Sequence, residues 1–440
     1  MKILQKKILF IAHSNNDFDH LLPILDKLSN MMDYKPYILF INSKEDVVIN
    51  NIHEQINGEL NIVQISLNEL FKYRILFKWV LKISRNISSL YGFISIKYML
   101  SHLRFDLLIL KLINRIIVYF LNRTISIYLP VITIKEFLIA HSFSMILLDI
   151  QHQKQDGVKR NIMSYTISNL MKESKINKTP IFMISHGAVI RFNTSIKEIH
   201  DESILTPDVL TLCNSNEISV YQNLIGPNTQ VLILGETRYD IQWINKLENM
   251  ALKYNPIQKP KNKFVILIIA ANLTFIKNDS IISEINSEIL KLLNENEDIE
   301  LWFKAHPRYP SYTTIKPTDR VRVFYNDVDT NFLLTLSDII ISPFSGVLFQ
   351  PIIQGKKVIY FDIWKKYCSN DTFTVFDNTR CVYKASSYEE LKKGVLALRR
   401  NPILEEEDAE EFYQSIISGG IPRNESIIDR YIKAMAIVLH

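Results

Sequence analysis

The sequence predicts an α/β protein in which two doubly wound parallel sheets face one another across a cleft. Short apolar runs of buried-strand type alternate with segments of helical period through most of the chain, which is typical of parallel sheets with right-handed crossovers. The 440 residues are too many for one ordinary core and suit two domains of roughly 200 residues each. A polar, lysine-rich stretch at Lys253–Lys263 interrupts the alternation and is the predicted linker.

The first half of the chain predicts one sheet. The apolar run Lys7–Ala12 predicts a strand, a polar loop follows from His13 to His20, and Leu21–Met31 has the apolar spacing of a helix. Further strands are predicted at Tyr37–Ile41, Leu60–Val63, Ser144–Ile150, Pro180–Ser185, Val209–Cys213 and Gln230–Leu234, and a helix at Asn161–Glu173.

The second half predicts another sheet of the same kind. Strands are expected at Phe264–Ala270, Glu300–Lys304, Val321–Phe324, Asp338–Ser342 and Lys357–Phe361, and helices at Ile281–Leu293, Asn331–Leu336, Val347–Gln354 and Tyr388–Arg399. We therefore expect a first domain over residues 1–250, a second over 263–420, and a C-terminal helix at 421–440 that packs back on the first domain.

A basic helical insertion is predicted at about 72–140 in the first domain. From Lys72 to Arg123 there are ten Lys or Arg residues and a single acid, Asp106, interleaved with aromatic and aliphatic residues. This pattern suits either an amphipathic surface on an anionic membrane or an ordinary solvated helical face. Nucleic acid is not expected as a partner, because no recognition motif accompanies the charge.

The composition favours a cytoplasmic protein. The membrane association that we predict is peripheral contact at the inner face of the cell membrane. The longest apolar region, Leu107–Leu121, is broken by polar and charged residues, whereas a spanning helix needs roughly 18 or more apolar residues. The N-terminal apolar run is short and lacks a cleavage site of small residues. Cys213, Cys368 and Cys381 are widely spaced, odd in number and without metal-ligand spacing.

Several catalytic motifs are missing from the sequence. There is no Walker A sequence, no GxGxxG after a strand, no HExxH and no GxSxG, which disfavours nucleotide hydrolysis, dinucleotide redox chemistry and serine hydrolysis. Asp327-Val328-Asp329 and Asp17-Phe18-Asp19 spell the short DxD pattern of metal-dependent sugar transfer. The first precedes a predicted helix, where acids are favoured by the helix dipole, so we prefer that interpretation. No metal or other cofactor is expected.

Ligands of open α/β sheets bind beyond the carboxyl ends of the strands, so residues just after predicted strands are the candidates. In the second domain, His306 and Arg308 follow one strand and suit a diphosphate or sugar carboxylate. Ser342, Ser345 and Gly346 follow another strand and open a helix, where hydroxyls and free N–H groups can bind an anion. A strand-end histidine and a helix N-cap at Ser345 are the plain alternatives.

In the first domain, His186-Gly187 leaves its strand toward the predicted cleft. Gly187 permits close backbone approach, and His186 is placed to act as general base on an acceptor hydroxyl, the alternative being a turn histidine. His13, Asp17 and His20 occupy the loop after the first strand and are the predicted acceptor-side residues, although Asp17 could instead cap the next helix.

The ordered motifs resemble a known family. The series His186-Gly187, Gly235–Asp240, Lys304–Pro307 and Ser337–Ser345 with Gln350 is similar to the CDP-glycerol glycerophosphotransferases and to related capsule and lipopolysaccharide transferases, including sialic acid and Kdo transferases. The resemblance covers roughly residues 180–362 and implies two Rossmann-like domains in the GT-B arrangement. It also implies that His186 activates the acceptor, that His306, Ser342 and Ser345 hold donor phosphates, and that Arg238 and Asp240 support the interlobe region. We therefore expect His186 and His306 to be the catalytic residues, and the donor-binding residues to be Ser342, Ser345, Arg308, Gly346, Gln350 and Arg238.

The predicted function is transfer of a sugar or polyol phosphate from a CMP-, CDP- or UDP-linked donor to a glycan or lipid-linked acceptor in surface-glycan synthesis. Oriented N–H groups, hydroxyls and an imidazole would stabilise the charge of the leaving group in a closed cleft. Two rivals remain open. One is a non-hydrolysing nucleotide-sugar epimerase with the same two-lobed fold. The other is a non-catalytic subunit of a glycan assembly complex, suggested because Gly346 stands where the family has a second serine.

Overall fold

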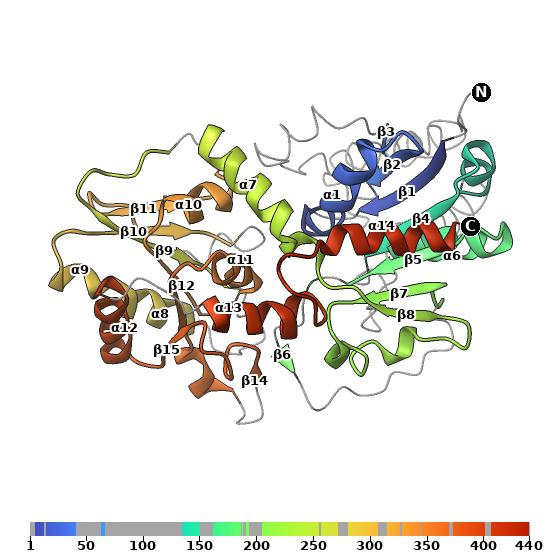
Figure 1. Ribbon diagram of the computed structural model, residues 1–440. Coiled ribbons are helices and arrows are strands. Elements are labelled where there is room, and N and C mark those ends of the chain that lie inside the picture. Colours follow the sequence, from blue (N-terminus) through green and yellow to red (C-terminus); the bar gives the residue numbers. More distant parts are fainter. Residues whose placement is uncertain are drawn as a thin grey trace, which may run out of the picture.

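The computed structural model describes residues 5–12, 15–40, 63–66, 134–149, 162–185, 187, 191–192, 205–254, 257–271, 280–306, 315–325, 328–343, 345–368, 373–400 and 406–439. These residues form two lobes, each built on a parallel sheet with helices on its faces (Figure 1). The predicted class of two doubly wound α/β domains is confirmed. Of the predicted insertion at 72–140, only a helix beginning at residue 134 lies within the described residues.

The first lobe contains a sheet of seven described strands in the order β3-β2-β1-β4-β5-β7-β8, with every neighbouring pair parallel. Alternate side chains of β1 enter different apolar cores: Ile8 and Phe10 belong to one, Leu9 and Ile11 to the other. Burial on both faces explains why these strands are continuous apolar runs in the sequence. The strands are β1 (Lys6–Ala12), β2 (Tyr34–Phe40), β3 (Val63–Ser66), β4 (Met145–Asp149), β5 (Ile181–Ile184), β7 (Val209–Leu212) and β8 (Gln230–Ile233), and helix α6 (Ile162–Ile176) lies between β4 and β5 in the chain.

Helix α1 spans Asn15–Ser29, so it begins six residues before the predicted start at Leu21. The prediction of a polar loop from His13 to His20 is therefore wrong for residues 15–20. The physical reason is that Phe18 extends the apolar spacing of Leu21, Leu22 and Leu25, and all four side chains are buried against the first sheet.

The second lobe contains a parallel sheet in the order β11-β10-β9-β12-β13-β15. Its strands are β9 (Phe264–Ile269), β10 (Ile299–Lys304), β11 (Val321–Phe324), β12 (Ile339–Ser342), β13 (Val358–Phe361) and β15 (Tyr383–Ala385). Its helices are α8 (Ile281–Leu290), α9 (Leu292–Glu295), α10 (Thr330–Leu336), α11 (Phe349–Ile353), α12 (Tyr388–Arg400) and α13 (Glu406–Phe412). The helix predicted at Val347–Gln354 is a 3₁₀ turn, η6 (Gly346–Leu348), followed by α11.

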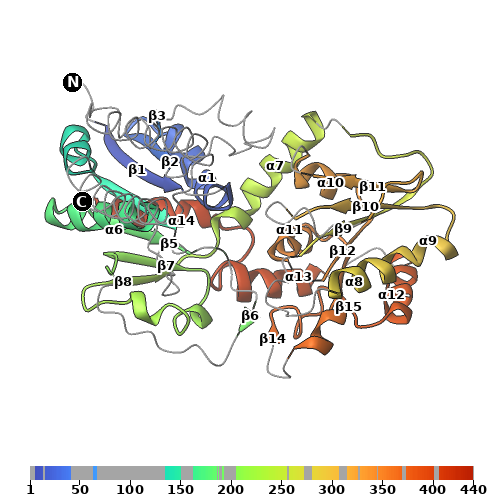
Figure 2. The same ribbon diagram turned by 180° about the vertical axis from the view of Figure 1, so that it is seen from behind.

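The two lobes are joined by helices and by one short strand pair. Helix α7 (Ile241–Tyr254) leads from the first lobe to the second, and helix α14 (Ile427–Val438) returns to lie against the first lobe, in contact with α1 (Figures 1 and 2). Strand β6 (Arg191–Phe192) pairs antiparallel with β14 (Phe373–Thr374) of the second lobe. One apolar cluster also runs from α1 and β1 into the second sheet, so the lobes share part of a core.

The basic stretch Lys72–Arg123 lies outside the described residues. Within the ranges that the structure describes, no helix is both long enough and apolar enough to cross a membrane.

Candidate active site

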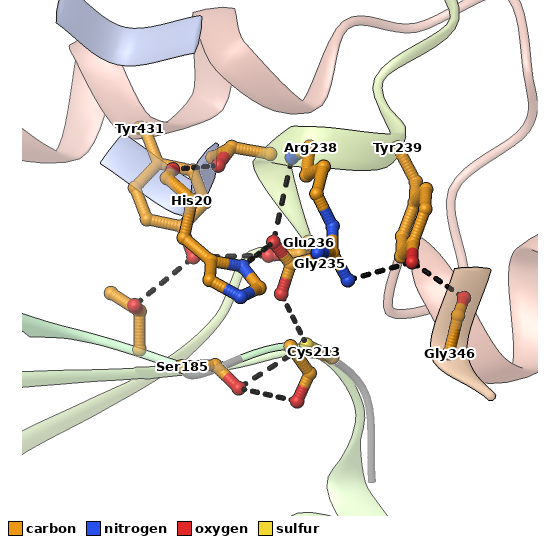
Figure 3. Close-up of polar contacts among 12 residues, drawn as sticks. His20, Ser185, Cys213, Gly235, Glu236, Arg238, Tyr239, Gly346 and Tyr431 are labelled. Carbon is orange, nitrogen blue, oxygen red and sulfur yellow. Dashed lines mark hydrogen bonds and ion pairs between the residues drawn. The ribbon is translucent and has the colours of Figure 1, made fainter. Parts of the chain in front are cut away.

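The carboxyl ends of the two sheets meet through a three-residue contact. The turn after β8 contains the 3₁₀ helix η4 (Thr237–Tyr239), and the turn after β12 leads into η6. The Tyr239 hydroxyl donates to the Gly346 carbonyl at 2.7 Å and accepts from Nη2 of Arg238 at 2.7 Å (Figure 3). Tyr239 is buried and its ring packs edge-on to that of Phe349. Tyr239 thus fixes the distance between Arg238 and the turn predicted to bind the donor.

Arg238 is the cation at this junction. Burial acts to lower its pKa, but Tyr239 and the carboxylates of Glu236 and Asp19 raise the pKa on balance, so the guanidinium is charged. A Cβ built on Gly187 would lie 3.8 Å from Nη2 of Arg238, which places the guanidinium beside the turn after β5 as well. The Nε atom of Arg238 is buried, and no described residue accepts a hydrogen bond from it.

Glu236 and His20 form a buried pair below Arg238. Nδ1 of His20 lies 2.7 Å from Oε1 of Glu236, and the two side chains are 1% and 2% exposed. Burial acts to raise the pKa of Glu236, but His20 and Arg238 lower it on balance, so the carboxylate is ionised at neutral pH. A carboxylate can only accept a hydrogen bond, so the imidazole is the donor.

The turn after β5 rests on a second buried cluster. The Ser185 hydroxyl donates to Oε2 of Glu217 at 3.2 Å and lies 3.3 Å from the Gly187 carbonyl. The Cys213 thiol lies 3.3 Å from the Ser185 hydroxyl and 3.5 Å from Oε2 of Glu236. Burial, together with Glu217 and Glu236, raises the pKa of Cys213, so the thiol keeps its proton. This cluster links the turn after β5 to Glu236.

Gly187 occupies a position that requires glycine. Its φ of +92° lies in the left-handed region, and an added Cβ would lie 3.0 Å from Cε1 of His20. The Gly187 backbone thus packs closely on His20, and the predicted close approach toward the cleft stays a prediction. His186 lies outside the described residues, so its role as general base stays a prediction.

In the second lobe, the structure locates some of the predicted donor residues at the expected edge. His306 follows β10 and is half-buried. Ser345 is half-buried, and its hydroxyl accepts from the N–H of Val347 at 3.2 Å, so it caps η6 as the plain interpretation holds. Gly346 contributes the carbonyl that Tyr239 binds. Arg308 lies outside the described residues.

Two predicted donor residues have structural partners instead. Ser342 is fully buried, and its hydroxyl donates to the Ile269 carbonyl of the neighbouring strand at 3.0 Å. The side chain is sealed inside the sheet, which corrects the expectation that it holds a phosphate. The Gln350 amide donates to Oδ1 of Asn331 at 2.6 Å and so ties α11 to α10.

The predicted acceptor-side residues are placed differently from the expectation. His20 lies inside α1 and is buried, because the helix starts earlier than predicted, so its loop placement is corrected. Asp17 lies in the first turns of the same helix. His13 lies outside the described residues.

The DxD pattern at 327–329 has a structural explanation. Asp329 is the N-cap of α10, and its Oδ1 accepts from the N–H of Asn331 at 2.7 Å. Asp329 thus stands at the start of a helix, as the preferred interpretation expects, and the structure adds that it is the N-cap. Asp327 lies outside the described residues. Within the described part of the chain, no group of three or more His, Cys, Asp or Glu side chains could hold a metal ion.

Several site residues have no predicted role in the sequence analysis. Glu236 and Tyr239 lie inside the motif Gly235–Asp240, so that motif could have directed attention to them. Ser185 immediately precedes His186 and could have been found in the same way. Glu217 lies in the 3₁₀ turn after β7 and bonds both the nearby backbone N–H of Cys213 and the distant hydroxyl of Ser185, and its contact with Ser185 has no local sequence signal.

Two parallel α/β lobes joined at the carboxyl ends of their sheets define a protein of the GT-B-like fold. No protein-family model matches the chain, and no curated protein matches its sequence. Solved structures do match. A putative UDP-N-acetylglucosamine 2-epimerase from Listeria monocytogenes aligns over 98% of this chain and 96% of its own, with a TM-score of 0.54 and 12% identity.

Two other solved structures are equally similar. The UDP-GlcNAc 2-epimerase from Neisseria meningitidis, bound to UDP-GlcNAc, aligns over 98% of this chain and 100% of its own, with a TM-score of 0.54 and 13% identity. The wall teichoic acid polymerase TagF aligns over 100% of this chain and 91% of its own, with a TM-score of 0.54 and 12% identity. At these identities the likeness concerns the fold.

Proposed function

We propose that this chain is a transferase that moves a sugar or a polyol phosphate from a CMP-, CDP- or UDP-linked donor to a surface-glycan acceptor. The observation that carries the proposal is the position of Arg238. Its guanidinium lies beside the turn after β5, where the acceptor base is predicted, and is fixed by Tyr239 to the turn after β12, where the donor is predicted. A cation at that junction suits a phosphate that bridges the two lobes.

In the proposed reaction, the acceptor hydroxyl gives its proton to His186 and its oxygen forms a bond to the transferred carbon or phosphorus. The bond from that atom to the nucleotide phosphate oxygen breaks, and the oxygen leaves with the electron pair. Arg238, His306 and Arg308 balance the negative charge that develops on the leaving phosphate. The Ser345–Gly346 turn holds the donor close to this cationic group.

A thermal-shift panel of CMP, CDP, UMP, UDP and GDP tests the donor site. A ligand that binds only the folded protein at about 100 times its Kd stabilises it by about 2.7 kcal/mol. We expect one nucleotide class to raise the melting temperature of the wild type and of Arg380→Ala, but not of His306→Ala. Arg380 is a matched control because it is a second-lobe cation that is 82% exposed. A panel without any shift would contradict the proposal and favour a non-catalytic subunit.

An epimerase is the second candidate, because the epimerase structures align over 98% of this chain with the same TM-score of 0.54 as the polymerase, which aligns over 100%. An epimerase needs no acceptor. Incubation of the protein with each nucleotide-linked donor alone, followed by analysis of the sugar, separates the two. Free nucleotide released only when acceptor is added supports the transferase, and an epimerised donor formed without acceptor supports the epimerase.

We also propose that the basic stretch Lys72–Arg123 keeps the enzyme at an anionic membrane surface, near a lipid-linked acceptor. Its ten basic residues and single acid support this proposal. Co-sedimentation with vesicles tests it: we expect binding to vesicles that contain anionic lipid, loss of binding in high salt, and no binding to neutral vesicles. Equal recovery with both kinds of vesicle would contradict it.

A further inference from the structure

We propose that His20 and Glu236 act as a positioning dyad, which holds the backbone at Gly187 and the guanidinium of Arg238 in register with one another. The inference rests on the proposed function, because those two groups form the first-lobe side of the proposed active site. His20 and Glu236 do not contact substrate, since they are 1% and 2% exposed.

The dyad reaches Gly187 through the imidazole. With Nδ1 bound to Glu236, the opposite edge of the ring faces the turn after β5: a Cβ on Gly187 would lie 3.0 Å from Cε1 and 3.6 Å from Nε2 of His20. Interiors are close-packed, so the ring sets how far the Gly187 backbone can move toward α1. Gly187 immediately follows the predicted base His186.

The dyad reaches Arg238 through the carboxylate. Glu236 is the N-cap of η4, and its Oε1, the oxygen that His20 binds, also lies 3.4 Å from the backbone nitrogen of Arg238. The same carboxylate adds charge attraction to the guanidinium. One carboxylate oxygen therefore connects the imidazole to the start of the 3₁₀ turn that carries Arg238 and Tyr239 (Figure 3).

The dyad is not needed merely to attach α1 to the rest of the lobe. The Thr237 hydroxyl donates to the backbone carbonyl of His20 at 2.6 Å, which ties α1 to η4 without the imidazole. Asp26 of α1 also pairs with Lys246 of α7 at 2.6 Å. The buried hydrogen-bonded pair of His20 and Glu236 lies next to two proposed active-site groups. Because other contacts already hold α1, this placement favours a positioning role.

The test compares His20→Asn and Glu236→Gln with the control Asp26→Asn in the full chain. His20→Asn keeps a donor near the position of Nδ1 and removes the ring edge that faces Gly187. Glu236→Gln keeps the shape and removes the charge. Asp26→Asn breaks a charged contact between α1 and α7 that involves neither Gly187 nor Arg238. For each variant we would measure nucleotide binding by thermal shift, and kcat and KM for the donor in the transfer reaction.

We expect His20→Asn and Glu236→Gln to lower kcat by about ten- to a hundredfold, the effect of a small misplacement of reacting groups. Nucleotide binding should weaken by less than the roughly tenfold loss expected for Arg238→Gln, because the guanidinium is displaced and not removed. Asp26→Asn should leave all three quantities unchanged. The inference is overturned if both dyad variants keep wild-type kcat, or if their loss of kcat is accompanied by loss of the cooperative thermal transition, as a general loss of structure would produce.

A spectroscopic measurement separates this inference from the proposed function. If the wild type binds no nucleotide and forms no product, the proposed function has failed. The dyad is then judged by NMR of protein labelled with ¹⁵N at its 10 histidines and 11 glycines. We expect a downfield imidazole N–H signal that is lost in His20→Asn and moves in Glu236→Gln. The Gly187 amide signal should shift in both dyad variants. Asp26→Asn should change neither signal. A Gly187 amide that is unchanged in the dyad variants would overturn the inference.

Discussion

Removal of the Tyr239 hydroxyl tests the contact between the lobes. Tyr239→Phe keeps the ring that packs on Phe349 and deletes one hydrogen bond to the Gly346 carbonyl and one from Arg238. A neutral hydrogen bond contributes about 0.5–1.5 kcal/mol net and one to a charged group about 1.5–3 kcal/mol. We therefore expect the free energy of unfolding to fall by about 2–4 kcal/mol, with no contribution from a cavity.

Tyr413 provides the matched control for this substitution. Its side chain is also fully buried, but its hydroxyl makes no hydrogen bond to any residue that the structure describes. Tyr413→Phe should therefore leave stability unchanged or raise it slightly, because no hydrogen bond is lost and a buried polar atom is removed. Urea denaturation of both variants, with the slope of the transition compared to wild type, measures the difference. Equal midpoints for Tyr239→Phe and Tyr413→Phe would refute the reasoning.

Three further predictions concern glycine conformation, helix capping and pH. Gly187→Ala should lower the melting temperature more than Gly355→Ala. Both glycines have positive φ, but only at position 187 would the added Cβ contact a neighbouring side chain. Equal losses would contradict this. Asp240→Ala should lower the free energy of unfolding, measured by urea denaturation, by about 2–4 kcal/mol, which is more than Asp329→Ala should. The reason is that Asp240 is fully buried, caps α7 and also accepts two hydrogen bonds from the start of α14. Because the pKa of Glu236 is lowered in the folded protein, its ionisation contributes stability above the unfolded pKa of about 4.3, and this stability is lost as the pH falls through the folded pKa. Glu236→Gln should therefore flatten the acid limb of a curve of unfolding free energy against pH. An unchanged acid limb would contradict this.

Most strands of the two sheets, though not β15, could be predicted because parallel strands buried on both faces leave a local signal. Met145–Asp149 and Ile339–Ser342 are apolar runs that need no partner to be recognised, and both are fully buried in the structure. Strand β6 and strand β14 have two residues each and depend on pairing between the lobes, so neither run is long enough to show a period.

The candidate site could be predicted only where its residues follow a strand. His306, Ser345 and Gly187 were found in this way, because the carboxyl ends of parallel strands share one edge of a sheet. The pairing of His20 with Glu236 could not, since the two are 216 residues apart and their contact depends on how α1 docks. The buried position of the Ser342 side chain was also missed, because its place as the last residue of a strand does not reveal which way the hydroxyl points.

The central claim is that Arg238 binds the phosphate of a nucleotide-linked donor between the lobes. Calorimetric titration of CMP, CDP and UDP into the wild type and Arg238→Gln tests it most directly. The account predicts a single site for at least one of the three nucleotides in the wild type, with affinity at least about tenfold weaker in the variant, because charged hydrogen bonds to phosphate are about twice as strong as neutral ones. Binding of equal affinity in both proteins, or no binding in the wild type, would contradict the claim.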